Sequence, residues 1–170
     1  MKQLILKVSD TADRWTRLIA GLVLATLVVL VMFQVIARYI FLAPPVWSEE
    51  LARYAMIWAG LLGASMSFKA KFDPALVQGE AAKAWLNFAR KVISSLAILI
   101  YLLPILWFCV YGPGMRVLRG FLVRHMRTSA ETLDFPTIYV AVSVPIALLL
   151  ILLHLCARWA GDGENPDKET

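Results

Sequence analysis

Two adjacent carboxylates, Glu49 and Glu50, are the residues of this sequence whose types most suggest chemistry. A carboxylate pair can act as general acid and base or hold a metal ion. Consecutive side chains on an α-helix point about 100° apart, so these two do not converge on one substrate atom. Arg53 follows Glu49 by one helical turn and is close enough to pair with it. We therefore expect a helix start with an ion pair near a membrane interface, with a contact to a partner subunit as the alternative.

The stretch around these carboxylates, residues 38–53, predicts a hinge between two helices. The proline pair at 44–45 lacks amide donors and disfavours helical backbone in the residue before each proline, so the arriving helix should end before Ala43. Ser48 can then cap a new helix with its side-chain oxygen. The two glutamates that follow lie in the first turn, where the helix dipole favours negative charge.

Long apolar runs flank this hinge on both sides. With 60% hydrophobic residues and a mean hydropathy of +0.70, the chain of 170 residues is too apolar for an ordinary soluble domain. We expect an all-α integral membrane protein with a single four-helix membrane domain over residues 1–160. Its transmembrane helices are predicted at residues 18–37, 48–68, 92–110 and 137–157.

The segments between the predicted spans differ in character. Residues 1–17 and 80–91 mix apolar side chains with charges at spacings typical of amphipathic helices that lie along a membrane interface. Residues 161–170 are polar and acidic, which predicts a disordered cytoplasmic tail. Pro104 and Pro145 lie inside the third and fourth spans and indicate kinks.

The distribution of basic residues predicts how the chain is oriented. The net charge is +5, but the cations lie at the edges of apolar runs and form no stripe among aromatic residues, so we expect no nucleic-acid partner. Lys and Arg concentrate in residues 2–17 and 69–91, which favours both termini in the cytoplasm. The connection between the third and fourth predicted spans opposes this orientation, because it is basic although it would lie outside the cytoplasm. Its arginines could bind an acidic partner or lipid headgroups, or they could indicate the inverted orientation. They are Arg116, Arg119, Arg124 and Arg127.

The second predicted span carries small residues that suit helix packing. Gly60 and Ala64 have the small-xxx-small spacing that allows close approach of another helix, and Gly63 widens this face. The partner helix could come from this chain or from another one. Trp47, before the span, is expected at the level of the lipid headgroups.

Several chemical functions find no support in the sequence. A haem between two histidines needs both at one depth, whereas His125 falls in a predicted outer loop and His154 near the opposite face. The sequence has no Ser-His-Asp arrangement, phosphate loop or metal-ligand cluster, and no acid or base at the centre of a predicted span. We therefore expect an accessory membrane subunit, with no cofactor, metal or enzymatic activity of its own.

Three stretches of the sequence resemble a known family. Residues 38–41 (Arg-Tyr-Ile-Phe) and 47–54 (Trp-Ser-Glu-Glu-Leu-Ala-Arg-Tyr) resemble the small membrane subunit of the tripartite ATP-independent periplasmic (TRAP) transporters. Residues 129–136 (Ser-Ala-Glu-Thr-Leu-Asp-Phe-Pro) are similar to that family's approach to its last span. In one departure, this chain has Lys69 and Asp73 where many members have a His and an Asp.

The resemblance implies a four-helix subunit of the bacterial inner membrane that braces a large multi-span permease and works with a periplasmic substrate-binding protein. Such systems import organic acids, among them C4-dicarboxylates and sialic acid, with an ion gradient, usually sodium, and without ATP. The candidate structural and partner contacts are Arg38, Trp47, Glu49, Glu50, Arg53, Trp58, Gly60, Gly63 and Ala64. The candidate contacts for the binding protein are Arg116, Arg119, Arg124 and Arg127, together with the hinge. Membrane lipids are the remaining expected partner.

Three other functions compete with this interpretation. The first is the small subunit of a tripartite tricarboxylate transporter, against which the Trp-Ser-Glu-Glu block at 47–50 argues. The second is the membrane anchor of a respiratory complex, which haem absorbance would support. The third is a membrane enzyme that uses Glu49 and Glu50, whose isolated subunit should lose turnover when either is changed to Gln.

Overall fold

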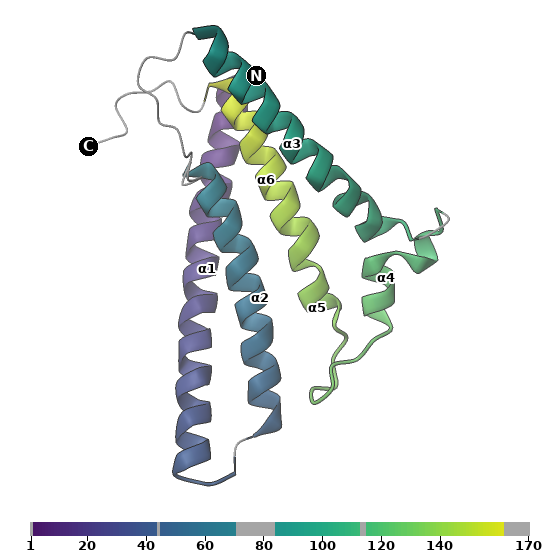
Figure 1. Cartoon of the computed structure of the whole chain (residues 1–170). Coiled ribbons are helices and arrows are strands. Elements are labelled where there is room, and N and C mark those ends of the chain that lie inside the picture. Colours follow the sequence, from purple (N-terminus) through teal and green to yellow (C-terminus); the bar gives the residue numbers. More distant parts are fainter. Residues whose placement is uncertain (1, 44, 71–83, 113–114, 162–170) are drawn as a thin grey trace, which may run out of the picture.

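The structure is a computed structural model that describes residues 2–43, 45–70, 84–112 and 115–161. Asp73 and most of the predicted acidic tail lie outside these residues. The elements are α1 (Lys2–Tyr39), α2 (Val46–Lys69), α3 (Ala84–Val110), the 3₁₀ helix η1 (Val117–Arg119), α4 (Phe121–Met126), α5 (Ile138–Ala141) and α6 (Ser143–Ala160) (Figure 1). The described part of the chain is therefore helical, as the sequence predicted.

The hinge after α1 has the predicted position. α1 ends at Tyr39, and Leu42 adopts a positive φ of 53° that reverses the chain direction. α2 begins at Val46 with Pro45 as its N-cap, so the predicted start at Ser48 was slightly late. The predicted cap was also wrong: the Ser48 hydroxyl donates to the carbonyl oxygen of Pro45 at 2.6 Å, because Ser48 already lies inside the first turn.

α1 is one continuous helix of 38 residues, about 57 Å long at 1.5 Å per residue. The expectation of a separate interfacial helix over residues 1–17 was therefore wrong. Ser9, Asp13 and Thr16 are buried on its first half, where they face α2 and α6. Because α1 continues straight into its apolar half, this first part packs against α2 and α6, and its polar side chains are buried there. A helix lying along the membrane surface would not bury them in this way.

The structure has three helical segments long and apolar enough to cross a membrane, by length and composition, among the described residues: Lys2–Tyr39, Lys91–Val110 and Ile138–Ala160. α2 is not among them. The prediction of four spans is thus supported for three segments. Pro104 lies inside an unbroken α3, whereas Pro145 lies in the first turn of α6, just after the break at Val142. Proline has no amide to donate to the carbonyl of Ala141, which explains that break.

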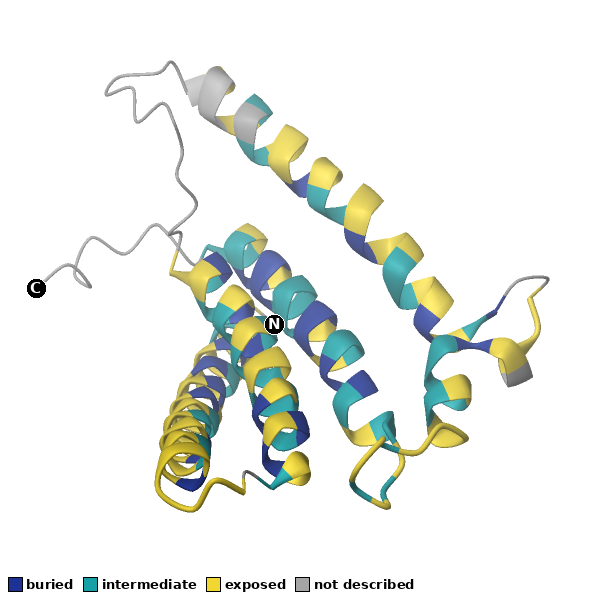
Figure 2. Ribbon diagram, turned by 60° about the horizontal axis from the view of Figure 1, so that its bottom comes forward, coloured by how far each residue is buried: buried dark blue, intermediate teal, exposed yellow. Residues whose placement is uncertain are grey.

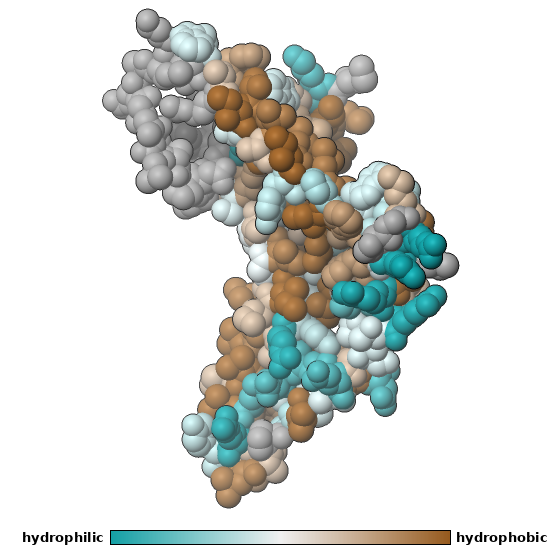
Figure 3. All heavy atoms as spheres, turned by 45° about the vertical axis from the view of Figure 1, so that its right-hand side comes forward, coloured by the Kyte–Doolittle hydropathy of each residue, from teal (hydrophilic) through white to brown (hydrophobic). Residues whose placement is uncertain are grey.

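α1, α2 and α6 pack side by side, while α3 contacts α6 near its start and then diverges (Figures 1 and 2). The start of α1 and the end of α6 lie at the same end of the molecule, which we call the terminal end. The hinge at residues 40–45 and the loop at 128–137 lie toward the other, the hinge end. Much of α1 and α3 is exposed (Figure 2), and many of the exposed residues on these helices are large and apolar. In Figure 3, hydrophilic side chains gather in the lower half of the visible face.

Candidate partner-contact surfaces

Glu50, just after the first turn of α2, is the residue around which the contacts of the hinge end are arranged. Its residue surface is only 7% exposed, although its neighbour Glu49 is exposed. The backbone amides of Glu131 and Thr132 donate to its two carboxylate oxygens at 3.0 and 2.8 Å. The Thr132 hydroxyl donates to the same group, and the Tyr54 phenol does so at 2.5 Å. We call this arrangement the carboxylate clasp.

The clasp joins parts of the chain that are far apart in sequence. An ionised carboxylate accepts hydrogen bonds only, and its acceptor sites match these donors. Charge-assisted bonds of this kind are about twice as strong as neutral ones. Blocks 47–54 and 129–136, which carried the family resemblance, are therefore in direct contact. Sequence reasoning assigned Glu50 to a helix start or a partner contact and missed the loop.

The predicted pair between Glu49 and Arg53 is confirmed, with 3.2 Å between the Arg53 Nη2 and Glu49 Oε1 atoms. Both side chains are exposed, to 75% for Glu49 and 56% for Arg53. Exposed pairs contribute little to stability, commonly about 0–1 kcal/mol. Arg38, in the last turn of α1, is also exposed. These charges are thus available at the surface of the hinge end.

Two tryptophans tie α2 to its neighbours. The ring of Trp47 stacks on that of Phe33 in α1 with 6.0 Å between centroids. The indole NH of Trp58 donates to the carbonyl oxygen of Tyr139 in α5 at 3.1 Å. Both residues were predicted as structural or partner contacts, and both make contacts within this chain.

The small-residue face of α2 is open in this structure. Gly60 and Ala64 are exposed and Gly63 is partly buried. A Cβ atom added at Gly60 or Gly63 would meet no atom within 4 Å. Among the described residues, no helix of this chain therefore uses these glycines for close packing.

The chain turns tightly between α3 and α4, and we call the described residues from 111 to 127, which include α4, the arginine turn. A Cβ atom on Gly112 would lie 2.2 Å from the carbonyl oxygen of Arg119, and one on Gly120 would lie 2.2 Å from that of Val110. Only glycine allows these backbones to approach so closely. The Gly112 amide donates to the carbonyl oxygen of Arg116 at 3.2 Å, which closes the turn.

The arginine turn carries several basic side chains. All of its arginines are exposed, and none of their side chains forms an ion pair within the part of the chain that the structure describes. They are Arg116, Arg119, Arg124 and Arg127. The predicted arginines therefore lie exposed on one short stretch of chain, from the residue before η1 to the residue after α4.

His125 fixes α4 to the loop that follows it. Its Nδ1 atom lies 2.9 Å from the Thr137 hydroxyl oxygen, and that hydroxyl also lies within hydrogen-bond distance of the carbonyl oxygens of His125 and Thr128, at 3.2 and 3.1 Å. The Phe121 ring packs against the imidazole at 4.5 Å. The arginine turn and the clasped loop are consequently linked to each other.

Lys69, in the last turn of α2, is the centre of the terminal end. Its ammonium group donates to the Ser9 carbonyl oxygen at 3.1 Å and to the Asp10 carboxylate at 2.8 Å. It also lies 3.8 Å from the carboxylate of Asp13, which pairs with Arg17 at 2.9 Å. The Lys69 and Asp13 side chains are only 12% and 11% exposed. Lys69 and Asp13 thus form a nearly buried ion pair between α1 and α2.

α6 completes the terminal end. The Ser9 hydroxyl lies 2.9 Å from Nδ1 of His154, and the Arg158 guanidinium donates to the carbonyl oxygen of Phe68 at 2.9 Å. The same guanidinium carbon lies 4.4 Å from the centroid of the Phe68 ring. His154 and His125 therefore belong to opposite ends of the molecule, as the sequence predicted.

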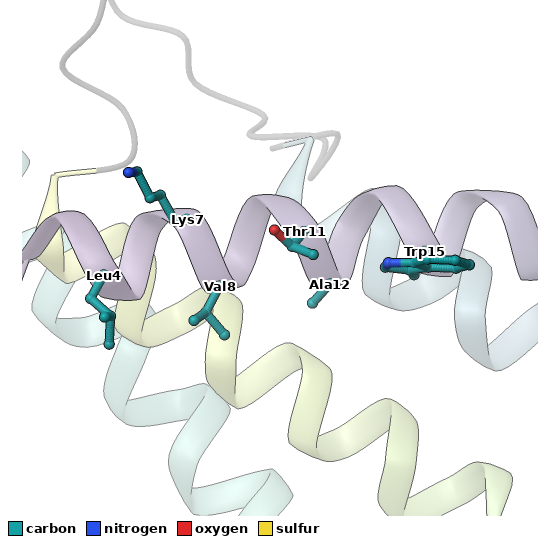
Figure 4. A pocket seen from close by; sticks show the side chains of 6 residues that line it. All are labelled: Leu4, Lys7, Val8, Thr11, Ala12 and Trp15. Atoms are coloured by element: carbon teal, nitrogen blue, oxygen red, sulfur yellow. The ribbon is translucent and has the colours of Figure 1, made fainter.

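Two shallow apolar grooves lie on the surface of α1. One, of about 420 Å³, follows the first turns of the helix, where Leu4, Val8 and Ala12 project from one side and Lys7 from the other (Figure 4). The other, of about 340 Å³, lies where α1, α2 and α5 meet and includes Thr26, Tyr54 and Trp58. Within the described residues, no group of three or more His, Cys, Asp or Glu side chains could hold a metal ion.

Comparison with known proteins gives the family. A family model described as "Tripartite ATP-independent periplasmic transporters, DctQ component" matches residues 27–163. No curated protein matches the chain. The matched range begins within α1 and extends past α6, so it contains α2, the carboxylate clasp and the arginine turn. This component is part of a transporter and not an enzyme family. The chain belongs to the DctQ component family of the tripartite ATP-independent periplasmic transporters.

Proposed function

We propose that this chain is the small accessory subunit of a secondary transporter that imports an organic acid, such as a C4-dicarboxylate or sialic acid, across the bacterial inner membrane. It pairs with a large permease subunit and works with a periplasmic substrate-binding protein, and an ion gradient, usually of sodium, drives uptake. The family match over residues 27–163 is the observation that carries this proposal.

In this proposal the chain is a brace and not a transport path. The buried charged groups Glu50 and Lys69 lie at the two ends of α2 and are occupied by partners from this chain. α2 is antiparallel to α1 and packs against it, so it crosses the bilayer beside α1 as a fourth span. Both termini then lie on one side of the membrane, which the basic residues favour as the cytoplasm.

The open face of α2 is the proposed contact for the large subunit. Gly60, Ala64 and Ser67 are exposed along one side of the helix, and a neighbouring helix could approach their backbone closely. Within this chain nothing covers that face among the described residues. Exposed Met56 extends it toward the hinge end.

The hinge end is the proposed contact for the binding protein. The exposed arginines of residues 116–127 provide positive charge, and Arg38, Trp47 and Glu49 lie exposed near the hinge. Exposed charges of this kind steer encounters with a soluble partner and set the salt dependence of binding.

The test of the assignment is a mild-detergent purification of the tagged chain from its native membrane, with mass spectrometry of the copurifying proteins. We expect a large multi-span permease. The complex in liposomes should import an organic acid only with the binding protein and an ion gradient present. Copurification of redox subunits with haem absorbance, or uptake that is unaffected by collapse of every ion gradient, would contradict the proposal.

The binding-protein contact has its own test. We expect Arg116→Glu with Arg119→Glu to weaken binding of the binding protein to the purified complex about tenfold or more at low salt, and less at high salt. Arg14→Gln, which removes an exposed arginine at the terminal end, is the control and should not change binding. Unchanged affinity in the double variant would assign those arginines to lipid headgroups instead.

A further inference from the structure

We propose that Glu50 is a positioning residue for partner recognition: its carboxylate holds the loop at residues 128–137, and through it the arginine turn, in the geometry that the periplasmic binding protein requires. This inference rests on the proposed function, because it assumes that the hinge end docks that protein. It assigns to Glu50 a role that neither its place in the helix nor its charge predicts.

The first step of the argument is the nature of the clasp. The two backbone amides that donate hydrogen bonds to Glu50 belong to consecutive residues, Glu131 and Thr132. The carboxylate therefore fixes the direction of the loop backbone as well as its distance from α2. The loop also contacts α2 through the Phe135 ring, whose centroid lies 6.0 Å from that of Tyr54. Within the loop, the Ala130 amide donates to the Phe135 carbonyl oxygen at 2.9 Å.

The second step is the link from the loop to α4. The Thr137 hydroxyl meets the His125 imidazole at 2.9 Å, and the Thr137 amide donates to the Thr128 carbonyl oxygen at 2.9 Å. These contacts hold the base of the loop against the end of α4. Arg124 and Arg127 flank His125, so their positions depend on the loop that Glu50 holds.

The third step is that few other contacts fix α4 to the helical core. α3, which carries the arginine turn, diverges from α1 and α2 over most of its length (Figure 2). The Glu50 clasp is the described polar contact that joins the N-terminal part of α2 to this outer part of the chain. Losing it leaves the arginines present but less well oriented.

The experiment uses the complex of this chain with its large subunit in liposomes. Glu50→Gln keeps the size of the side chain but turns an amide donor toward groups that are themselves donors. Thr132→Val removes one donor of the clasp and leaves Glu50 in place, while Thr132→Ser retains the hydroxyl. Thr26→Val is the matched control, because the Thr26 hydroxyl donates only to its own helix, at the Leu22 carbonyl oxygen.

Two readouts separate positioning from general stability. Hydrogen exchange of the peptide containing residues 128–137 should become about tenfold faster in Glu50→Gln, the factor expected for one lost charge-assisted bond. The apparent KM for the loaded binding protein should rise about fivefold with kcat unchanged, because a mispositioned surface weakens docking and not transport itself. Thr132→Val should show the same changes to a smaller extent, and both Thr132→Ser and Thr26→Val should behave as the unmodified chain.

The possible outcomes separate the existence of the clasp from its role in recognition. Unchanged exchange in Glu50→Gln and Thr132→Val would overturn the clasp, and faster exchange with an unchanged KM would overturn its role in recognition. A fall in kcat with unchanged KM would also count against the proposal. If Glu50→Gln does not accumulate, the comparison of Thr132→Val with Thr132→Ser provides the same test. Failure of the docking surface itself is distinguishable, because Arg116→Glu with Arg119→Glu would then leave binding unchanged.

Discussion

Each end of α2 has one largely buried charged side chain at its centre, and the two differ in the partners that surround the charge. Glu50, just after the first turn, is negative, and Lys69, in the last turn, is positive. These signs agree with the helix dipole at each end. Glu50 is surrounded by neutral donors, two of them backbone amides, whereas Lys69 is surrounded by the carboxylates of Asp10 and Asp13.

The difference shows which end is built for stability and which is suited to contact. At the terminal end, the loss of Lys69 removes the cation that Asp10 and Asp13 share and leaves the buried Asp13 carboxylate paired with Arg17 alone among the described residues. Removing one partner of a buried charge is costly. At the hinge end, the loss of Glu50 leaves amides and hydroxyls on a loop, where water can replace the carboxylate. We therefore expect changes at the terminal end to affect the folded state most, and changes at the hinge end to affect partner binding.

The largest expected effect comes from Lys69→Met, which keeps the length of the side chain and removes its charge. Because the variant breaks a buried pair, we expect a loss of about 3 kcal/mol in the free energy of unfolding. Denaturation of the purified chain in mixed micelles, followed by circular dichroism, measures this loss. Combining the change with Asp13→Asn should restore part of the stability. A double variant that is less stable than Lys69→Met would contradict the buried-pair account.

A smaller effect is expected for Arg158→Met at the same end. The variant loses a charge-assisted hydrogen bond to the Phe68 carbonyl oxygen, for which about 2 kcal/mol is typical. The same denaturation experiment applies. Arg158→Lys retains the charge and should lose less. Equal losses in the two variants would show that the planar guanidinium, and not its charge, matters at this contact.

In the middle of α2, Trp58→Phe should cost about 1 kcal/mol, because it removes one neutral hydrogen bond to the Tyr139 carbonyl oxygen and keeps most of the apolar contact. Trp15→Phe is the control, since Trp15 is 61% exposed. If the two variants lose equal stability, the Trp58 bond contributes nothing to the packing of α2 on α5.

The smallest effect on the chain alone is expected for Gly60→Ala. A methyl group at this position meets no atom within 4 Å, and alanine favours helix by about 1 kcal/mol, so the isolated chain should be unchanged or slightly more stable. Recovery of the large subunit in the pull-down should nevertheless fall. Gly120→Ala provides the contrast, because its methyl group would collide with backbone and should destabilise the chain by itself. Undiminished recovery with Gly60→Ala would remove this face from the proposed interface.

The parts of the structure that the sequence predicted correctly are those with local causes. The prolines at 44–45 predicted the hinge, and the one-turn spacing of Glu49 and Arg53 predicted their ion pair. The clasp could not be predicted in this way. Apart from the Tyr54 phenol, its donors belong to Glu131 and Thr132, about 80 positions away from Glu50 in the sequence. Two of them are backbone amides, which every residue except proline carries.

Lys69 illustrates the same limit at the other end of α2. Its pattern indicates only a basic residue at the edge of an apolar run, which is typical of a topology determinant. Its carboxylate partners lie on α1, and their register becomes known only when the two helices are packed. Asp13 itself, which looks like part of a surface helix in the sequence, is buried for this reason. Residue types thus predicted the ends of the helices, and packing determined which charges are buried.

The unbroken α1 also makes the molecule a lever. A straight rod about 57 Å long that tilts by about 10° around one end moves its other end by about 10 Å. Since the first half of α1 is held by Lys69 and His154, any small rotation of that packed end is carried along the whole helix. A tilt of about 10° at the terminal end would therefore displace the hinge by about one helix diameter.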